Sequence, residues 1–285
     1  MPKTILIPVT GNDSDSIVFK GALDVATRFG GHLDFLYVRP SPGEMAANLA
    51  VEGGVGLSAG LLDRLEEEAA AQQVAARALV HRFAEGTKLV LGAEQPNAAG
   101  VSAAWHAKEG RENEWIPLYA RTSDLTVIGR PTRFGAEERM ALEAALFDSG
   151  RPVLLPTAGG LTLDTIAIAW KSTREAARAV GAAGPFLAKA KRIVVITARE
   201  GGRDDPADTQ RLLVTLRRLY AAAEHRHLEP QARHAGQMLL AAAGEAGAGL
   251  LVMGAYGHSR LREWVFGGVT EQVLRSATIP VLMVH

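Results

Sequence analysis

The chain has 285 residues, of which 47% are hydrophobic and 22% charged, so it is long enough for two domains with full cores. Its 31 basic and 31 acidic residues balance, which argues against a general nucleic-acid binder or a protein held on an acidic membrane surface. The absence of cysteine excludes disulfides, thiol catalysis and cysteine-based zinc sites.

The sequence shows no pattern of membrane insertion or export. No charge-free apolar stretch reaches the ~18 residues that a membrane-spanning helix requires. The first residues enter a strand-like pattern without the apolar segment of a signal peptide. The expected location is therefore the cytoplasm, with no membrane and no nucleic acid among the partners.

The first part of the chain alternates between strand and helix patterns. A strand over Thr4–Val9 precedes a helix over Asp15–Phe29, and a second strand follows at His32–Val38. The Pro- and Gly-rich segment Arg39–Leu57 is interpreted as an insertion before a long helix over Ser58–Glu85, with Ser58 as its N-cap. Short apolar strands without strict alternation, separated by helices, are typical of a parallel sheet covered on both faces.

The remaining elements of this half are a weak third strand near Leu89–Leu91, a fourth at Asp124–Gly129 and a last strand entered through Pro152. Proline is tolerated at the first residue of a strand because the ladder does not yet need its N–H. The turn-rich segment Pro156–Thr162 then marks the boundary between the halves.

The second half repeats this pattern. Its predicted elements are, in order, a strand at Thr165–Trp170, a helix at Arg174–Ala188, and strands at Arg192–Ala198, near His227–Leu228, at Gly249–Gly254 and at Val281–Val284. A repeat at half the chain length indicates two homologous domains, 1–157 and 163–285. Each is predicted to be a doubly wound α/β domain with a mostly parallel five-stranded sheet.

A ladder of glycines follows the apolar run Leu250–Met253. Gly254 and Gly257 are followed, after nine residues, by Gly267 and Gly268 at the start of a helical pattern. Glycines let the backbone approach a ligand, and the free N–H groups of a helix start attract phosphate. The alternative is that these glycines form only a turn and a tight contact between helix and strand.

This ladder resembles the nucleotide-binding signature of the universal stress protein family, G-x2-G-x9-G followed by a small hydroxyl residue. Taken together, the two halves resemble a tandem member of that family, which shares the adenine nucleotide α-hydrolase-like fold. The resemblance implies ATP binding, with or without Mg²⁺, and a pseudo-twofold pair of domains within the chain. It implies contact between the last strands, Val153–Leu155 and Val281–Val284, and it allows a homodimer.

The resemblance implies one nucleotide site in the C-terminal half. Backbone or hydroxyl groups would reach the phosphates, an apolar side chain (Ile196) would lie against adenine, and the cationic side chains of the loop suit an anion. The residues implied are Gly254, Gly257, His258, Arg260, Gly267, Gly268, Val269, Thr270, Lys171 and Ile196.

Three departures from the family pattern are visible. ATP-binding members usually end the first strand with Asp, but Lys171 and Thr10 stand there in the two halves. Gly268 replaces a hydroxyl residue. In the N-terminal half, Pro131 follows Gly129 and Arg130, and proline has no N–H to donate. The N-terminal site is therefore expected to be lost.

Three classes of function stay open. The first is a nucleotide-binding protein of stress response or signalling, and the second is an interaction scaffold of the same fold that binds no nucleotide. The third is a weak ATP hydrolase, for which the sequence offers no convincing base or nucleophile. No metal site is expected, because His225 and His227 have no evident third ligand.

Overall fold

The computed structural model describes residues 1–46, 59–92, 100–131, 136–198, 206–220, 222–229, 235–255 and 268–285. The elements of the first half are β1 (Thr4–Val9), α1 (Asp15–Phe29), β2 (His32–Arg39), α3 (Ala59–Thr87), β3 (Val90–Leu91), β4 (Ser102–Glu109), α4 (Glu112–Thr122), β5 (Leu125–Val127), α5 (Ala136–Glu143), a π-helix (Ala144–Asp148) and β6 (Val153–Leu155). The N-cap predicted at Ser58 lies outside the described residues.

The elements of the second half are β7 (Thr165–Ala169), α6 (Arg174–Ala182), α7 (Gly184–Leu187), β8 (Arg192–Ala198), α8 (Pro206–Leu219), β9 (Ala222–Leu228), α9 (Ala235–Glu245), β10 (Leu250–Gly254), α10 (Gly268–Ser276) and β11 (Val281–Val284). The predicted helix Arg174–Ala188 is wrong in one respect, because it divides at Ala183. Pro185 stands in the first turn of α7, where a new helix can begin but an existing one cannot continue undisturbed.

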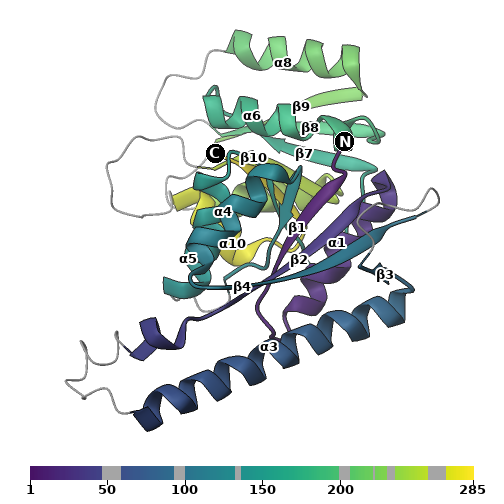
Figure 1. Cartoon of the computed structure of the whole chain (residues 1–285). Coiled ribbons are helices and arrows are strands. Elements are labelled where there is room, and N and C mark those ends of the chain that lie inside the picture. The colour runs from purple at the N-terminus through teal and green to yellow at the C-terminus, as the bar shows by residue number, and fades with distance from the viewer. Residues whose placement is uncertain are drawn as a thin grey trace.

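The described strands form one sheet in the order β3-β4-β2-β1-β5-β6-β11-β10-β7-β8-β9 (Figure 1). All neighbours are parallel except β6 and β11, which pair antiparallel where the two halves meet. Leu154 pairs with Leu282 at the centre of this contact, as a pseudo-twofold axis requires. The predicted α/β fold and the predicted contact between the last strands are confirmed, and the sheet is continuous through edge pairing without an exchange of strands.

The third strand of the first half was placed wrongly by the sequence pattern. The predicted segment forms β3, which has only two residues and adds an extra edge to the sheet. The strand that lies beside β2, where the third strand of this half was expected, is β4 (Ser102–Glu109), and it pairs with β2 along its whole length. Only its first two residues are buried, so the strand lacks the apolar run that identifies the others.

Two apolar layers cover the two faces of the sheet. Along β1, Ile5 and Ile7 belong to one layer and Leu6 to the other, and all three are fully buried. The first layer continues through both halves, where the rings of Phe29 and Phe186 meet edge to face at 5.2 Å between centroids. The two halves therefore share packing as well as a sheet.

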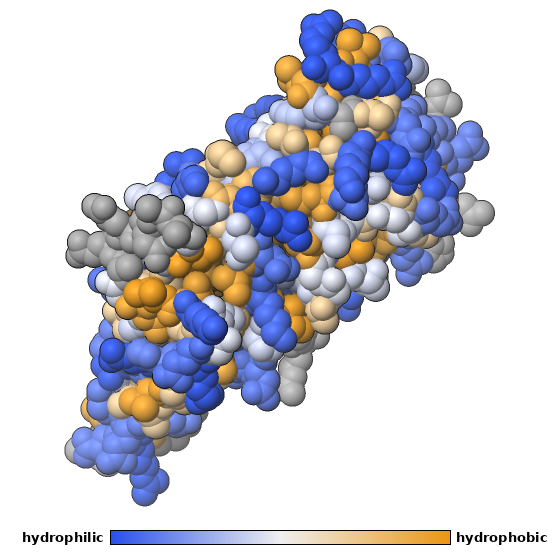
Figure 2. Space-filling model, turned by 90° about the vertical axis from the view of Figure 1, so that its right-hand side faces the viewer, coloured by the Kyte–Doolittle hydropathy of each residue, from blue (hydrophilic) through white to orange (hydrophobic). Residues whose placement is uncertain are grey.

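The two outermost helices, α3 and α8, lie at the bottom and the top of the molecule (Figure 1). Hydrophilic residues cover much of the surface there, with small hydrophobic groups among them (Figure 2). Val74 on α3 and Leu219 on α8 are among the exposed apolar side chains. Helix α3 buries Ala76 and Val80 beneath the first half of the sheet, so its inner stripe is structural.

Candidate functional site

The described residues among those implied by the glycine ladder lie at the carboxyl ends of β7, β8 and β10 or at the start of α10. Strand β7 pairs with β10 on one side and with β8 on the other. Gly254, Lys171 and Ile196 therefore lie near one another at the end of the sheet where these parallel strands terminate, called here the carboxyl edge. Helices α6 and α10 begin at this edge. Gly268, Val269 and Thr270 open α10, whereas Gly257, His258, Arg260 and Gly267 lie outside the described residues.

Gly254 is explained by packing. A Cβ placed on it would come within 2.5 Å of the Ala176 backbone nitrogen and 2.6 Å of the Glu175 carbonyl carbon. The end of β10 thus lies directly on the first turn of α6, and only glycine permits this approach. The tight contact between helix and strand accounts for this glycine without a ligand.

The start of α6 carries its own carboxylate. The Thr173 hydroxyl caps the helix by accepting from the Ala176 N–H at 3.3 Å. Burial acts to raise the pKa of Glu175, but its own N–H, the Thr173 hydroxyl and the nearby charges of Arg174 and His285 outweigh burial and lower that pKa. Because Glu175 is an anion here, the α6 start does not favour a second one.

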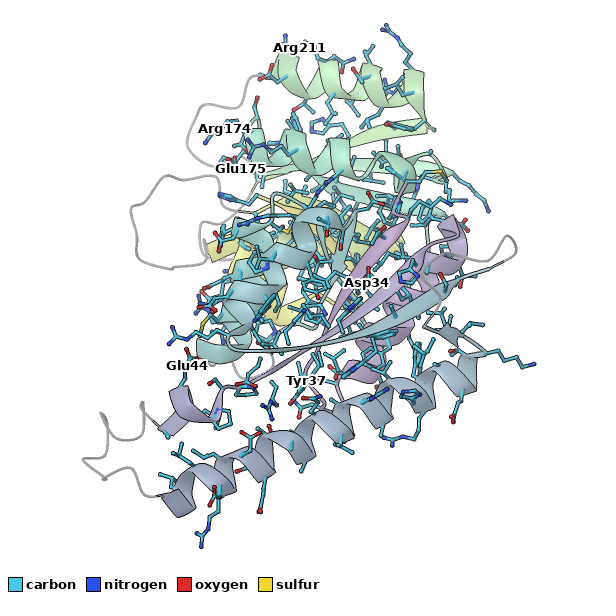
Figure 3. All side chains as sticks on the ribbon, in the orientation of Figure 1. Asp34, Tyr37, Glu44, Arg174, Glu175 and Arg211 are labelled. Carbon is cyan, nitrogen blue, oxygen red and sulfur yellow. The ribbon has the colours of Figure 1, made fainter. Side chains whose placement is uncertain are left out.

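A polar cluster joins the loop after β7 to α8. The Ser172 hydroxyl donates to the Asp208 carboxylate, which also pairs with Arg211. Arg174 is almost fully exposed beside Glu175. Figure 3 shows Arg174, Glu175 and Arg211 at the same end of the C-terminal half. This end of the sheet therefore carries cations whose partners are at or near the surface.

The segment after β7 brings an indole N–H to the same edge. The backbone of Trp170 donates to Ile196 at 2.8 Å, and Lys171 accepts from the Thr173 N–H at 2.7 Å. The Trp170 ring packs on the core, and its Nε1 is buried without a hydrogen-bond partner in the described part of the chain. Ile196 is only 1% exposed and belongs to the other apolar layer.

The start of α10 is exposed. A Cβ placed on Gly268 would meet no other described residue within 4 Å. Thr270 is buried and Val269 packs on the core, so the helix is anchored one residue further on. Gln272 accepts from the Gly236 N–H at 2.9 Å and ties α10 to the start of α9. The backbone at Gly268 is thus accessible on a fixed helix.

The matching edge of the N-terminal half is filled by its own side chains. The Asp15 carboxylate accepts from the Thr10 N–H at 3.0 Å, from the Thr10 hydroxyl at 2.9 Å and from the Gly11 N–H at 2.8 Å. Burial raises the pKa of Asp15 despite these hydrogen bonds. Gly11 has φ of +81°, and its Cβ position lies 3.4 Å from Ala76 of α3.

Ion pairs extend this closure along β2 and β4. Arg39, at the end of β2, pairs with Glu66 of α3 and with Glu109 of β4. The Tyr37 and Trp105 rings stack with 6.1 Å between centroids. The long helix α3 therefore packs beside the carboxyl ends of β1 and β2.

The degenerate loop of the N-terminal half has a different contact. Arg130 donates to the Ala277 carbonyl at the end of α10, across the junction of the halves. Burial lowers the pKa of Arg130, although it remains a cation. A Cβ on Gly129 would meet Val18 at 3.4 Å, an ordinary contact. Arg130 therefore joins the halves, and Gly129 is not needed for packing.

Each half also carries a pair of histidines between its second and third strands. Asp34 pairs with His106 at 2.8 Å and with His32 at 3.4 Å. In the second half the Thr197 hydroxyl, near the carboxyl end of β8, contacts His225 at 2.8 Å and His227 at 3.1 Å, whereas Asp34 lies near the start of β2. These two histidines lie on β9, where the sequence predicted a strand near His227–Leu228.

The sequence analysis did not identify the residues that determine the charge and hydrogen bonding at the candidate site. Thr173 and Glu175 form a recognisable pattern of an N-cap followed by an acid in the first turn. The contact of Ser172 with Asp208 on α8 could not be predicted from a local sequence pattern, because the two residues are distant in the chain. Among the described residues no helix is long and apolar enough to cross a membrane, and no group of three or more metal-ligating side chains occurs.

Comparison with known proteins identifies the class. The model of the universal stress protein family matches residues 1–143 and again residues 163–285. Because these matches span most of the chain, it belongs to the universal stress protein family, as a tandem member with two family units.

Relatives of similar length match nearly the whole chain. A universal stress protein of Synechocystis is 26% identical over 98% of this chain and 99% of its own length. The crystal structure of a universal stress protein from Archaeoglobus fulgidus aligns with a TM-score of 0.67 at 18% identity, covering 98% and 97% of the two chains. A functionally unknown protein from Pseudomonas aeruginosa aligns at 0.52 and 17%, covering 99% and 92%. At these identities the structural likeness establishes the fold.

Proposed function

We propose that residues 1–157 and 163–285 form two domains, and that the second binds ATP or a related nucleotide in a cytoplasmic stress response or signalling role. The observation that carries this proposal is the exposed start of α10 at Gly268, at the carboxyl ends of the same strands as Trp170, whose buried indole N–H has no hydrogen-bond partner among the described residues. The matching edge of the first domain is filled by Asp15, Arg39 and α3.

The chemistry of this edge suits a nucleotide phosphate. The first N–H groups of α10 have no helical partner and carry its partial positive charge. The glycines of the ladder would add further N–H groups, and Arg260 and Lys171 would add cationic donors. The indole N–H needs an acceptor, which a ribose or base oxygen would provide.

Calorimetric titration with ATP, with and without Mg²⁺, tests the proposal. The wild type should bind, Gly257→Trp should not, and Gly129→Ala in the closed domain serves as the matched control. Absence of heat up to millimolar ATP would instead favour an interaction scaffold. That alternative has specific support, because packing alone explains Gly254 and Glu175 adds negative charge nearby.

Lys171→Asp tests which part of the nucleotide Lys171 meets. Restoring the acid usual in the family should tighten binding if the ribose hydroxyls have lost their acceptor, and weaken it if Lys171 holds a phosphate. Steady phosphate release that is abolished by mutation of one acidic residue would replace simple binding by hydrolysis.

A further inference from the structure

In the described part of the chain, the sheet leaves two outer strands with a neighbour on one side alone. The strands that join the halves, β6 and β11, already pair with each other, so the sheet ends at β3 and at β9 (Figure 1). The unpaired N–H and C=O groups of such an outer strand can pair with another chain, and folds commonly protect them. The two outer edges of this sheet differ in that protection.

The outer edge in the first half begins beneath an added strand. Strand β3 pairs with the first two residues of β4, and the Gly92 N–H donates to the Ala103 carbonyl at 2.8 Å. Ala223 is the counterpart of Ala103 on β9, since each pairs with the second residue of the next strand inward. The Ala223 carbonyl accepts instead from the Arg217 side chain of α8 at 2.7 Å. One side chain therefore stands where the first half has a strand.

The outer side of β9 presents the backbone of alternate residues. The Ala223 carbonyl accepts from a side chain of α8 and so points away from β8. The same follows from β8, where the Ile196 carbonyl bonds to Trp170 on the side of β7 and leaves the alternate residues to bond to β9. Because backbone groups alternate along a strand, those of His225 and His227 also point outward. Both histidines are exposed.

Strand β9 is complementary to itself in charge. When two copies lie antiparallel with His225 opposite the partner's His225, Glu224 lies opposite the partner's Arg226. In that register the outward groups form the hydrogen-bonded pairs, and the charged side chains stand in the closer pairs between them. Opposite charges directly across two strands stabilise their pairing, whereas like charges destabilise it. Moving the centre by one residue would place Glu224 opposite Glu224, or Arg226 opposite Arg226, so charge favours the register centred on His225.

The uncharged residues match in the same register. The remaining pairs join a small residue to a larger one: Ala223 with His227, and Ala222 with Leu228. Beside this edge, Val214 of α8 is 42% exposed and lies on the helix face that also carries Arg217. The α8 helices of two paired copies would approach each other here and cover Val214.

The charged residues of β9 already belong to surface ion pairs that a second copy would extend. Glu224 lies 3.6 Å from Arg192, and Arg226 pairs with Glu245 of α9. All four side chains are partly exposed, and exposed ion pairs contribute little each, so Glu224 and Arg226 can turn toward a second copy at small cost. The result is a row of alternating charge that crosses from one copy to the other.

We propose that the chain forms a homodimer in which β9 pairs antiparallel with β9 of a second copy, joining two sheets into one. The occupant of this edge is a second copy because the strand matches itself in charge, in side-chain size and in the direction of its free backbone groups. The dimer requires no nucleotide.

Sedimentation velocity of the full chain at pH 8, where histidines are neutral, measures the dimer. The wild type should change from monomer to dimer between about 10 µM and about 1 mM. Glu224→Arg and Arg226→Glu should each weaken dimerisation about tenfold or more, because each places like charges across the two strands. Glu68→Arg and Arg64→Glu, the same changes on exposed α3, should leave it as in the wild type.

Mixing the two β9 variants separates a lost contact from a folding defect. One variant carries two positive charges on β9 and the other two negative charges, so in equal amounts they should dimerise with each other at least as well as the wild type does. Failure of the mixture to dimerise would overturn the proposal.

A proline variant tests the backbone pairing. His225→Pro removes an outward N–H that no described strand uses, so it should abolish the dimer while urea unfolding stays close to that of the wild type. His225→Ala keeps the N–H and should still dimerise. A wild-type chain that stays monomeric throughout the concentration range would overturn the proposal, and so would a dimer that persists in His225→Pro, because the contact would then use another surface.

Discussion

The two halves of the sheet share a strand order but use the carboxyl ends of their strands differently. In the first half the Asp15 carboxylate, the Arg39 ion pairs and α3 fill this edge. In the second half Gly268 begins α10 at the surface, with no other described residue within 4 Å of its Cβ position. The two halves therefore keep the same kind of core, while in the first half internal contacts cover the strand ends that are accessible to a ligand in the second.

The sharpest way to test this difference is the matched pair Gly254→Ala and Gly129→Ala. The new methyl group at 254 would lie 2.5 Å from backbone of α6, whereas the one at 129 would meet a side chain at 3.4 Å. We expect the first to lower the free energy of unfolding by about 2 to 3 kcal/mol and the second by less than about 0.5 kcal/mol. Urea unfolding measures both, and equal losses would contradict the packing role of Gly254.

The contact across the halves should have the next largest effect. Arg130→Gln removes the cation that donates to the Ala277 carbonyl and leaves that carbonyl with a weaker donor. The expected loss is about 1 to 2 kcal/mol in the free energy of unfolding. Arg218→Gln on exposed α8 is the control. A loss no greater than the control's would mean that Arg130 contributes nothing to the junction.

The histidine clusters should differ in their response to acid. Burial acts to raise the pKa of Asp34, but hydrogen bonds from His32 and His106 and their charges outweigh it and lower that pKa from 3.8. The unfolded chain then takes up the proton at higher pH than the folded one. The stabilisation is complete above the unfolded pKa and is lost as pH falls through the folded one, below 3.8.

Asp34→Asn should therefore cost about 1 kcal/mol at pH 7 and flatten the fall in stability between pH 5 and pH 3. Thr197→Val, in the histidine cluster of the second half, should leave the fall between pH 5 and pH 3 as in the wild type, because no described carboxylate is bonded to His225 or His227. Unfolding in urea at several pH values distinguishes the two. An unchanged acid dependence in the Asn variant would show that Asp34 is not responsible.

The smallest expected effect is at Gly268→Ser, which restores the hydroxyl usual in the family. The site has room for the side chain, so unfolding should change by only a few tenths of a kcal/mol. If the proposed nucleotide site is correct, one added hydrogen bond should tighten ATP about five- to tenfold in calorimetry. Weaker binding by the serine variant would argue against phosphate at this helix start.

The sequence predicted the features that depend on local pattern. The bounds of β1, α1 and β8 agree with expectation, because apolar runs and a glycine after α1 mark their ends. Strand β4 had no such mark, since only its first two residues are buried. The candidate site was harder, because Gly254 and the α6 start meet only in the folded chain. Arg130 and Ala277, far apart in sequence, could not be paired by any local rule.

The antiparallel pairing of β6 and β11 also has a consequence for how such a chain can evolve. In an assembly of two identical subunits, every substitution appears twice, once at each edge. Here the two units are encoded separately but are always present in equal numbers, and their carboxyl-end edges face opposite directions. A residue can therefore be altered in one unit without altering its counterpart, and the partner unit needed to complete the sheet is never in short supply.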